Sequence, residues 1–322
     1  MAASKLMPTP DTKNQLAREI APDNRFFHLF MAGVSGALIA TAAVCVARLN
    51  YRLSAPGFND YAGMVAFLIA SGYCLWAKLE RFFQVCLIVF WSFLLGKLLG
   101  FPVYLAARSR MPLQDNALAR FDQVVGVQVP SILHLMANHP WAKTFFAASY
   151  DWLFAMMVLS VMLPAVTYRW TAAKELLVAT SFATIIGSLM FAFCPAIGPW
   201  EAYHFPPSAQ QRVCETLFMT LRSGSLHVLS SNDKGIICFP SFHVMLAIVS
   251  CIALCSIKAL RIAAILVAGC VVISTLTTGW HYIADVIAGL TLAVIAELLA
   301  KGFTRIEERF TNSRGNLGAR EI

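Results

Sequence analysis

The sequence predicts an all-α fold, a polytopic membrane helical bundle of about eight transmembrane helices. Three observations support this prediction. The 322 residues are 58% hydrophobic and only 13% charged, whereas a soluble domain carries about 25% charged residues. The mean hydropathy is +0.67. The apolar residues also occur in blocks long enough to cross a bilayer core of about 30 Å, and a helix satisfies all its backbone polar groups within such a block.

The eight expected spans are separated by polar segments that carry most of the charge. A polar tail of residues 1–28 precedes the first span. This tail is too long and too acidic for a simple signal peptide, so the first span is expected to be retained. A second polar tail, residues 301–322, follows the last span. The spans are residues 29–49, 61–77, 82–107, 145–168, 176–194, 242–257, 262–279 and 281–300.

The basic residues predict how the chain is oriented in the membrane. The formal net charge is +8, but Lys and Arg stand singly at the ends of spans, so we expect membrane lipid and not nucleic acid as the partner. With eight spans, 15 basic residues lie on the side of both termini and 9 on the other side. The positive-inside rule then places both termini in the cytoplasm. The two long loops, about 108–144 and 195–240, would face the periplasm or lumen.

Three ionisable residues at span starts are the strongest candidates for function. His243 opens one span, and His281 and Asp285 open another on the same predicted side. Ionisable groups in a membrane are rare and are functional candidates by default. Because His281 and Asp285 are four residues apart, they are expected to share a helix face, where the carboxylate can fix the imidazole tautomer. Each feature also has a simpler interpretation, an interfacial histidine or an ordinary buried pair.

The residues around these groups predict a phosphate pocket. Pro240 and Ser241 precede the helix of His243, and the free backbone N–H groups of its first turn can bind an anion. Ser274 and Thr275 lie about two turns before His281. A transporter would also explain intramembrane ionisable groups, but transport sites lie near the bilayer midplane, whereas these groups gather at one surface.

These residues resemble two motifs of the type 2 phosphatidic acid phosphatase superfamily. Residues 240–243 match its Pro-Ser-x-His motif. Ser274, His281 and Asp285 match its next motif at the right spacing, although Thr275 stands where the family has Arg. The resemblance implies a six-helix catalytic core over residues 82–300. Residues 29–81 would then form two additional N-terminal helices.

The resemblance also points to one branch of the family. Its first motif, Lys-x6-Arg-Pro, is expected after the fifth span, but residues 194–201 read Cys-Pro-Ala-Ile-Gly-Pro-Trp-Glu. The loss of this motif and of the third-motif Arg is more similar to the inositol phosphorylceramide synthase and sphingomyelin synthase branch. Those proteins are lipid phosphotransferases, and the Pro199–Trp200 element is similar to the former.

The mechanism implied by the resemblance needs neither a metal ion nor another cofactor. His281 would attack phosphorus and form a phosphohistidine, and Asp285 would orient it. His243 would protonate the leaving oxygen and then act as general base. The substrate-binding candidates are residues that could hold or neutralise phosphate oxygens: Ser241, Ser274, Thr275, Arg212, Arg222 and Lys234.

A lipid phosphotransferase is the preferred prediction, and a phosphatidic acid or polyprenyl phosphate phosphatase is the alternative. Both activities use the same residues. A phosphomonoester dianion needs strong cationic partners, which the family supplies through the Lys and Arg that this chain lacks. A phosphodiester carries one negative charge and needs less neutralisation. Glu201 near the entrance would further disfavour a dianion.

The cysteines predict one possible disulfide. Of the nine, only Cys194, Cys214 and Cys238 lie near the second outer loop, and the other six fall within spans. A loop in an oxidising compartment can keep a disulfide. We expect either a Cys214–Cys238 bridge over the pocket or three free thiols.

Overall fold

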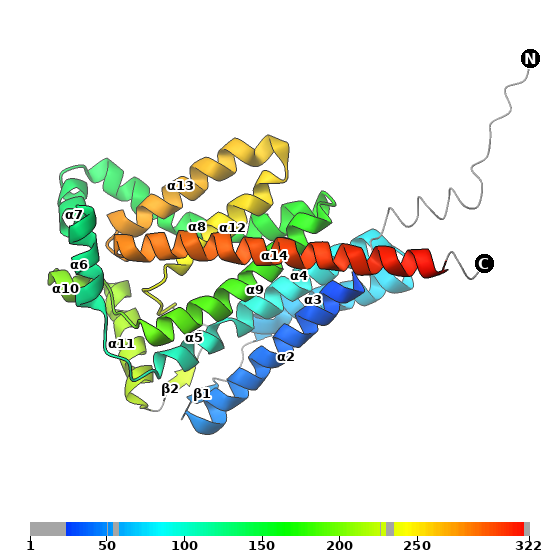
Figure 1. Ribbon diagram of the computed structural model, residues 1–322, viewed down its shortest axis with the longest axis horizontal. Coiled ribbons are helices and arrows are strands. Elements are labelled where there is room, and N and C mark those ends of the chain that lie inside the picture. The colour runs from blue at the N-terminus through cyan, green and yellow to red at the C-terminus, as the bar shows by residue number, and fades with distance from the viewer. Residues whose placement is uncertain (1–23, 50, 54–57, 226, 230–234, 319–322) are drawn as a thin grey trace, which may run out of the picture.

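The computed structural model describes residues 24–49, 51–53, 58–225, 227–229 and 235–318 (Figure 1). Helices dominate the described residues, and two short strands pair in parallel. The elements are α2 (Arg25–Arg48), β1 (Tyr51–Leu53), α3 (Phe58–Trp76), α4 (Glu80–Leu98), α5 (Gly100–Ala107), α6 (Asp115–Val125), α7 (Val129–Ala137), α8 (Pro140–Val166), α9 (Trp170–Phe193), α10 (Pro199–Tyr203), α11 (Ala209–Ser223), β2 (His227–Leu229), α12 (Phe242–Cys255), the 3-10 turn η1 (Lys258–Leu260), α13 (Arg261–Thr277) and α14 (Ile283–Gly318).

The predicted all-α membrane bundle is confirmed, but the count of eight spans is not. Among the described residues, six helices have the length and apolar composition to cross a membrane. They are α2, α4 continued by α5, α8, α9, η1 continued by α13, and α14. The other two predicted spans correspond to shorter apolar helices, Ala62–Trp76 within α3 and Phe242–Cys255.

Small side chains let the central helices approach one another closely. Helix α9 packs against α14, α12, α5 and α8, and its buried residues include Ala179, Ala183 and Gly187. Helix α14 buries Ala293 and Ala296 completely. In membranes, where lipid tails compete with apolar side chains, such small-residue faces allow close van der Waals packing. The main apolar core is thus built on α9, α12 and α14, and α2 and α4 also contribute buried side chains to it.

Gly289 brings the start of α12 directly onto α14. A Cβ atom at this position would lie 2.5 Å from the backbone carbonyl oxygen of Ser241. A side chain is therefore excluded unless the two helices move apart. The contact fixes the beginning of α12, which carries the Pro-Ser-x-His residues, against the first turns of α14.

The short helices gather at one end of the bundle. Figure 1 shows α6, α7, α10 and α11 at the end where α14 begins. Strand β1 pairs with β2 and so ties the segment after α2 to the segment after α11. At the opposite end, α2 begins beside the later part of α14, where the Phe26 ring stacks on Phe303 at 5.1 Å between ring centroids. The start of α2 and the later part of α14 therefore lie at the same end of the bundle.

A buried ion pair holds the end of the bundle at which α2 begins. Lys174 of α9 pairs with Glu307 of α14 at 2.5 Å, and their side chains are 10% and 3% exposed. Lys174 Nζ also donates to the Asn24 side-chain oxygen at 3.1 Å. The Phe27 backbone N–H donates to Glu307 at 3.2 Å. The pair and its hydrogen bonds thus join α2, α9 and α14.

We predict that Glu307→Ala destabilises the protein strongly, because it leaves the Lys174 ammonium buried without its carboxylate. The cost of breaking a buried pair in this way is about 3–5 kcal/mol. The measurement is the thermal unfolding midpoint of the purified protein in detergent. A double variant, Lys174→Met with Glu307→Leu, removes both charges and should recover most of the lost stability.

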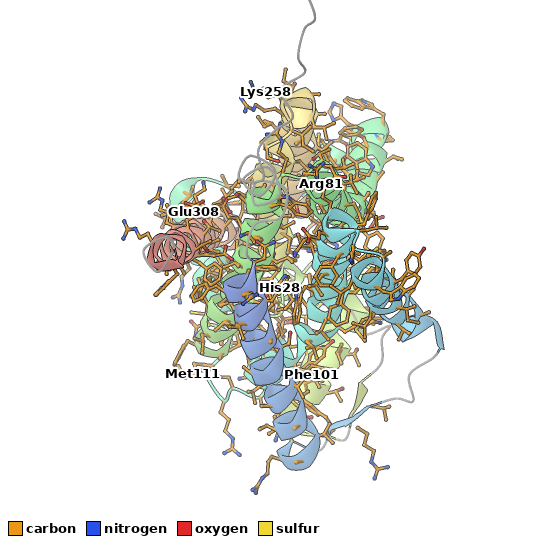
Figure 2. The ribbon with its side chains drawn as sticks, turned by 90° about the vertical axis from the view of Figure 1, so that its right-hand side faces the viewer. His28, Arg81, Phe101, Met111, Lys258 and Glu308 are labelled. Atoms are coloured by element: carbon orange, nitrogen blue, oxygen red, sulfur yellow. The ribbon has the colours of Figure 1, made fainter. Side chains whose placement is uncertain are left out.

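The matched control is Glu308→Ala on the neighbouring residue. Figure 2 shows Glu308 on α14 and His28 on α2, and the Glu308 side chain is exposed. Removing an exposed charge should change the unfolding midpoint little. Equal effects of the two alanine substitutions would contradict the importance of the buried pair.

Candidate active site

His281 lies in the turn between α13 and α14. The sequence predicted that it shares a helix face with Asp285, but α14 begins only at Ile283, so His281 precedes the helix. Gly279 makes the turn possible with φ of +74°, a left-handed conformation that glycine adopts at little cost. The Thr275 carbonyl then accepts the backbone N–H of His281 at 3.2 Å. The turn folds the imidazole back toward Asp285.

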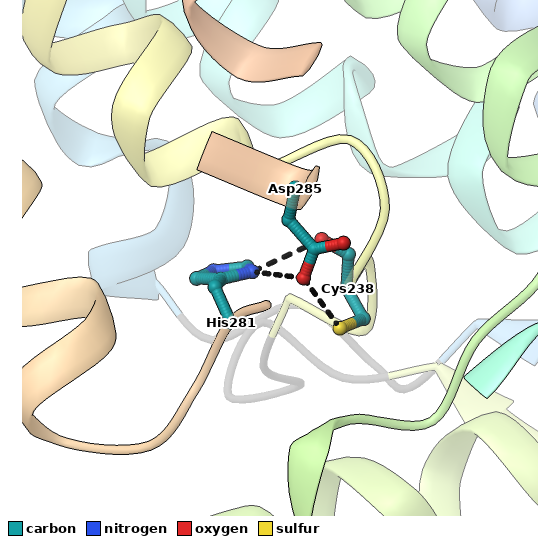
Figure 3. A group of neighbouring side chains, drawn as sticks. All are labelled: Cys238, His281 and Asp285. Atoms are coloured by element: carbon teal, nitrogen blue, oxygen red, sulfur yellow. Dashed lines mark hydrogen bonds and ion pairs between the residues drawn. The ribbon is translucent and has the colours of Figure 1, made fainter. Parts of the chain in front are cut away.

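The Asp285 carboxylate and the Cys238 carbonyl both hold the same nitrogen of His281. The Nδ1 atom lies 3.3 Å from Asp285 Oδ2 and 3.0 Å from the carbonyl oxygen of Cys238 (Figure 3). Asp285 Oδ2 also accepts the Tyr282 backbone N–H at 2.8 Å. His281 is 3% exposed and Asp285 is fully buried. Because both oxygens require a proton on Nδ1, the other nitrogen, Nε2, keeps a free lone pair for chemistry.

Cys238 is a member of this cluster that sequence reasoning assigned to another role. Its thiol Sγ lies 3.1 Å from Asp285 Oδ2. Burial, followed by the nearby Asp285 charge, raises the pKa of the Cys238 thiol well above its usual value, so the thiol keeps its proton and donates it. Of the two expected alternatives, the Cys214–Cys238 bridge is wrong, because both cysteines are in the reduced form. The sequence feature that could have placed Cys238 in the site was its position two residues before Pro240.

The same three side chains have donor types that bind transition metals. Cys238 Sγ, a nitrogen of His281 and a carboxylate oxygen of Asp285 lie within 4.8 Å of one another. Cysteine, histidine and aspartate are common zinc ligands. In the structure these atoms share hydrogen bonds with one another. That arrangement requires protons on Sγ and Nδ1, which metal binding would displace.

The second imidazole, His243, lies in the first turn of α12. Ser241 caps this helix, and its hydroxyl accepts the Val244 backbone N–H at 3.4 Å. The Ser241 backbone N–H donates to the Asp285 carbonyl at 3.1 Å. This bond connects the two sequence motifs directly. The ring centroids of His243 and His281 are 6.3 Å apart, so the predicted convergence of the two histidines is present in the fold.

An aromatic side chain, Tyr150, packs against His243, and two tryptophans extend the aromatic contacts from Tyr150. The Tyr150 ring of α8 stacks on His243 at 4.1 Å between centroids, with the hydroxyl 3.3 Å from Nδ1. Tyr150 also stacks on Trp280 at 5.8 Å. Trp200 meets Trp280 edge to face at 6.0 Å. The sequence did not predict these contacts, because the position of α8 relative to α12 cannot be derived from periodicity.

The candidate substrate-binding residues have different surroundings in the structure. Ser241, Ser274 and Thr275 are fully buried. The Ser274 and Thr275 hydroxyls donate to backbone carbonyls of their own helix, at 2.6 and 2.7 Å. Arg212 is exposed on α11, and Lys234 lies outside the described residues. Arg222 donates to the backbone carbonyl of Ser109 at 2.7 Å, and also to that of Met111. Their roles in binding phosphate remain predictions.

Helix α6 anchors this end of the bundle with two buried aspartates. Asp115 accepts the backbone N–H groups of Ile197 and Gly198 at 3.0 and 2.9 Å, and the Tyr282 hydroxyl at 3.1 Å. Asp122 accepts the backbone N–H of Ala284 at 3.3 Å. Burial raises the pKa of Asp122 to about 6, and it also raises the pKa of Asp115, although hydrogen-bond donors oppose both shifts. The carboxylates bind donors that an external anion could otherwise use.

Comparisons with known proteins identify the family. No match was found among curated proteins or among solved structures. The family described as PAP2 superfamily matches residues 116–299, which is more than half of the chain. The matched region contains His243, His281 and Asp285 and all six candidate substrate-binding residues. This chain is a member of the PAP2 superfamily, a lipid phosphatase or phosphotransferase type of multi-pass membrane protein.

Proposed function

We propose that this enzyme transfers a phosphoryl group from a lipid-linked phosphate through a phosphohistidine at His281. One observation carries the proposal. The Nδ1 atom of His281 is held by Asp285 and the Cys238 carbonyl, while a second imidazole, His243, lies across a centroid separation of 6.3 Å. The other nitrogen of His281, Nε2, is thus positioned for nucleophilic attack, and the His243 imidazole is placed to carry a proton.

The proposed reaction has two balanced steps. In the first, His281 Nε2 forms a bond to phosphorus while the bond to the leaving oxygen breaks, and His243 gives its proton to that oxygen. In the second, His243 takes a proton from an incoming water or alcohol, whose oxygen bonds to phosphorus as the phosphorus–nitrogen bond breaks. Asp285 stabilises the positive charge that develops on His281. The two histidines supply the nucleophile and the acid–base group, so this chemistry needs no metal ion.

Ser241 is the proposed contact for the phosphoryl oxygens. Its hydroxyl caps α12 as an acceptor and retains its own proton for donation. Positioning and electrostatic stabilisation of the equatorial oxygens dominate phosphoryl transfer. The exposed Arg212 on α11 is a further candidate for neutralising the substrate.

The preferred activity is transfer to an alcohol, in the manner of an inositol phosphorylceramide synthase. Arg222, one of the candidate cations, donates to two backbone carbonyls of the segment after α5. Trp200 occupies the place of the family's first motif and donates to Glu215 at 3.0 Å. Thr275 stands where the family has Arg, and the loss of that cation favours a phosphodiester, with one negative charge, over a phosphomonoester dianion. Hydrolysis of a lipid phosphate is the alternative.

We also propose that the site faces the periplasm or lumen. The site lies at the end of the bundle where α14 begins, and α2 begins at the opposite end, which the distribution of basic residues assigns to the cytoplasm (Figure 1).

The catalytic assignment predicts that His281→Ala and His243→Ala each lower turnover by at least about 100-fold. Asp285→Asn should retain more activity, because the amide can still orient the imidazole in part. Turnover of a labelled phospholipid measures the loss, and the thermal midpoint in detergent verifies folding. His139→Ala, which changes an exposed histidine before α8, is the control and should keep activity. Normal turnover in a folded His281→Ala or His243→Ala protein would exclude the mechanism.

The product predicted for a phosphotransferase is a new phosphodiester. Purified protein is incubated with a head-group-labelled phosphodiester lipid or a labelled phosphatidic acid, each with and without inositol or a lipid alcohol. We expect the label of the first lipid to enter a new diester only when the alcohol is present. Release of free phosphate from phosphatidic acid, unchanged by either alcohol, would identify a phosphatase.

The orientation predicts which engineered cysteines react from outside the cell. Ser131→Cys on α7 should react with a membrane-impermeant maleimide on spheroplasts or sealed vesicles of known sidedness, whereas Glu308→Cys should react only after permeabilisation. Both residues are exposed in the structure. Unsubstituted protein measures the background from native thiols. The opposite pattern would reverse the topology.

A further inference from the structure

We propose that Tyr150 is a positioning residue for His243. Its hydroxyl accepts the Nδ1 proton of His243, so that Nε2 is the nitrogen that exchanges a proton with the leaving and incoming oxygens. This inference rests on the proposed function, because it explains how the acid–base histidine of that reaction is controlled. Tyr150 belongs to α8, outside the segments that resemble family motifs, so no sequence motif pointed to it.

The geometry places Tyr150 against His243 in two ways. The hydroxyl lies 3.3 Å from Nδ1. The two rings also stack with centroids 4.1 Å apart and planes 24° apart. The electron-rich face of a phenol attracts a protonated imidazole, so stacking supports the acid form that the first step requires. Tyr150 therefore fixes the orientation of the His243 ring and stabilises its protonated form.

Tyr150 is itself held in place by the turn that carries His281. Its ring is nearly parallel to Trp280, with planes 14° apart and centroids 5.8 Å apart. Trp280 packs against Trp200, whose indole N–H donates to Glu215. The aromatic contacts thus connect α8 to both histidine segments. A displacement of α8 would change the position of His243 relative to His281.

His281 is held by a carboxylate and His243 by a neutral hydroxyl, and this difference fits the proposed roles of nucleophile and acid–base group. A nucleophile benefits from the carboxylate of Asp285, because that charge stabilises the imidazolium formed when His281 bonds to phosphorus. An acid–base group must both release and accept a proton, and a full negative charge beside it would hold the proton too tightly. The neutral hydroxyl of Tyr150 fixes Nδ1 without that charge.

The proton inventory is balanced through one turnover. Protonated His243 carries hydrogen on both nitrogens, with Nδ1–H donating to the Tyr150 oxygen. In the first step the Nε2 proton moves to the leaving oxygen, while the Nδ1 proton stays in place. In the second step Nε2 takes a proton from water or alcohol, which restores the starting form. Tyr150 neither gains nor loses a proton.

The test compares Tyr150→Phe on two substrates that differ only in the leaving group. One carries an alkyl leaving group, which needs protonation, and the other carries p-nitrophenolate, which leaves without it. The measured quantity is kcat/KM, which reports the reaction through release of the leaving group. We expect a loss of about tenfold with the alkyl substrate and less than about twofold with the p-nitrophenyl substrate. The His243-dependent limb of the pH profile should shift with the alkyl substrate.

Three control variants separate this role from a general structural effect. His243→Ala should show the same leaving-group selectivity with a larger loss. Asp285→Asn should lower kcat/KM for both substrates by the same factor, because both need the nucleophile. Phe146→Leu, one turn earlier on α8, should leave the ratio of the two kcat/KM values unchanged.

The outcomes distinguish this inference from the proposed function. Suppose that His243→Ala lowers kcat/KM mainly for the alkyl substrate, but Tyr150→Phe lowers kcat/KM equally for both substrates or for neither. The role of Tyr150 is then overturned and the proposed function stands. If His243→Ala shows no selectivity, the acid–base role of His243 is overturned, and this inference fails with it. Selectivity in both variants, with an unchanged ratio in Phe146→Leu, supports the assignment.

Discussion

The hydrogen bonds of Asp285 are the contacts on which the arrangement of the site depends. Its carboxylate accepts the Cys238 thiol, the Tyr282 backbone N–H and Nδ1 of His281, and its carbonyl accepts the Ser241 backbone N–H. One residue thus joins the segment before α12 to the start of α14. A buried carboxylate oxygen is costly unless it is hydrogen-bonded, so the three donors that meet Oδ2 are a condition for burying that oxygen. The buried Oδ1 has no hydrogen-bond partner among the described residues. Once the three donors are in place, they also fix the nitrogen that His281 presents.

The outer helices are attached to this centre by the same kind of interaction. Asp115 and Asp122 of α6 accept backbone N–H groups of the segment before α10 and of the first turn of α14. A helix N-terminus attracts negative charge, because its first N–H groups lack helical partners. In this chain Asp122 provides that charge from within the protein at α14. Helix α6, the segment before α10 and the start of α14 are therefore parts of one hydrogen-bonded unit.

Sequence reasoning could predict the apolar helices and the three ionisable residues, because hydropathy and spacing depend on local composition. It predicted that His281 and Asp285 meet, but it assumed a shared helix, whereas Gly279 creates a turn that delays the helix until Ile283. It could not place Tyr150 beside His243, since the two residues are 93 positions apart and their contact follows from how α8 packs on α12. Cys238 was interpreted from the oxidising surroundings of a loop, but its burial beside Asp285 makes it a hydrogen-bond donor.

The charge balance of the site has a consequence for the type of substrate. The cluster around His281 contains one carboxylate, Asp285, and helices α10 and α11 carry Glu201 and Glu215. Arg222 is engaged by backbone carbonyls, and the family's Arg is replaced by Thr275, whose hydroxyl donates to its own helix. A dianionic phosphate is repelled by these acidic side chains more strongly than a monoanion is, and electrostatic interactions are strong where water is excluded. Arg212, exposed on α11, is a candidate for compensating this charge. A monoanionic diester meets less repulsion, and the neutral donors Ser241 and the first-turn N–H groups of α12 suit its two unesterified oxygens. These charges support the proposed exchange of one ester for another over release of inorganic phosphate.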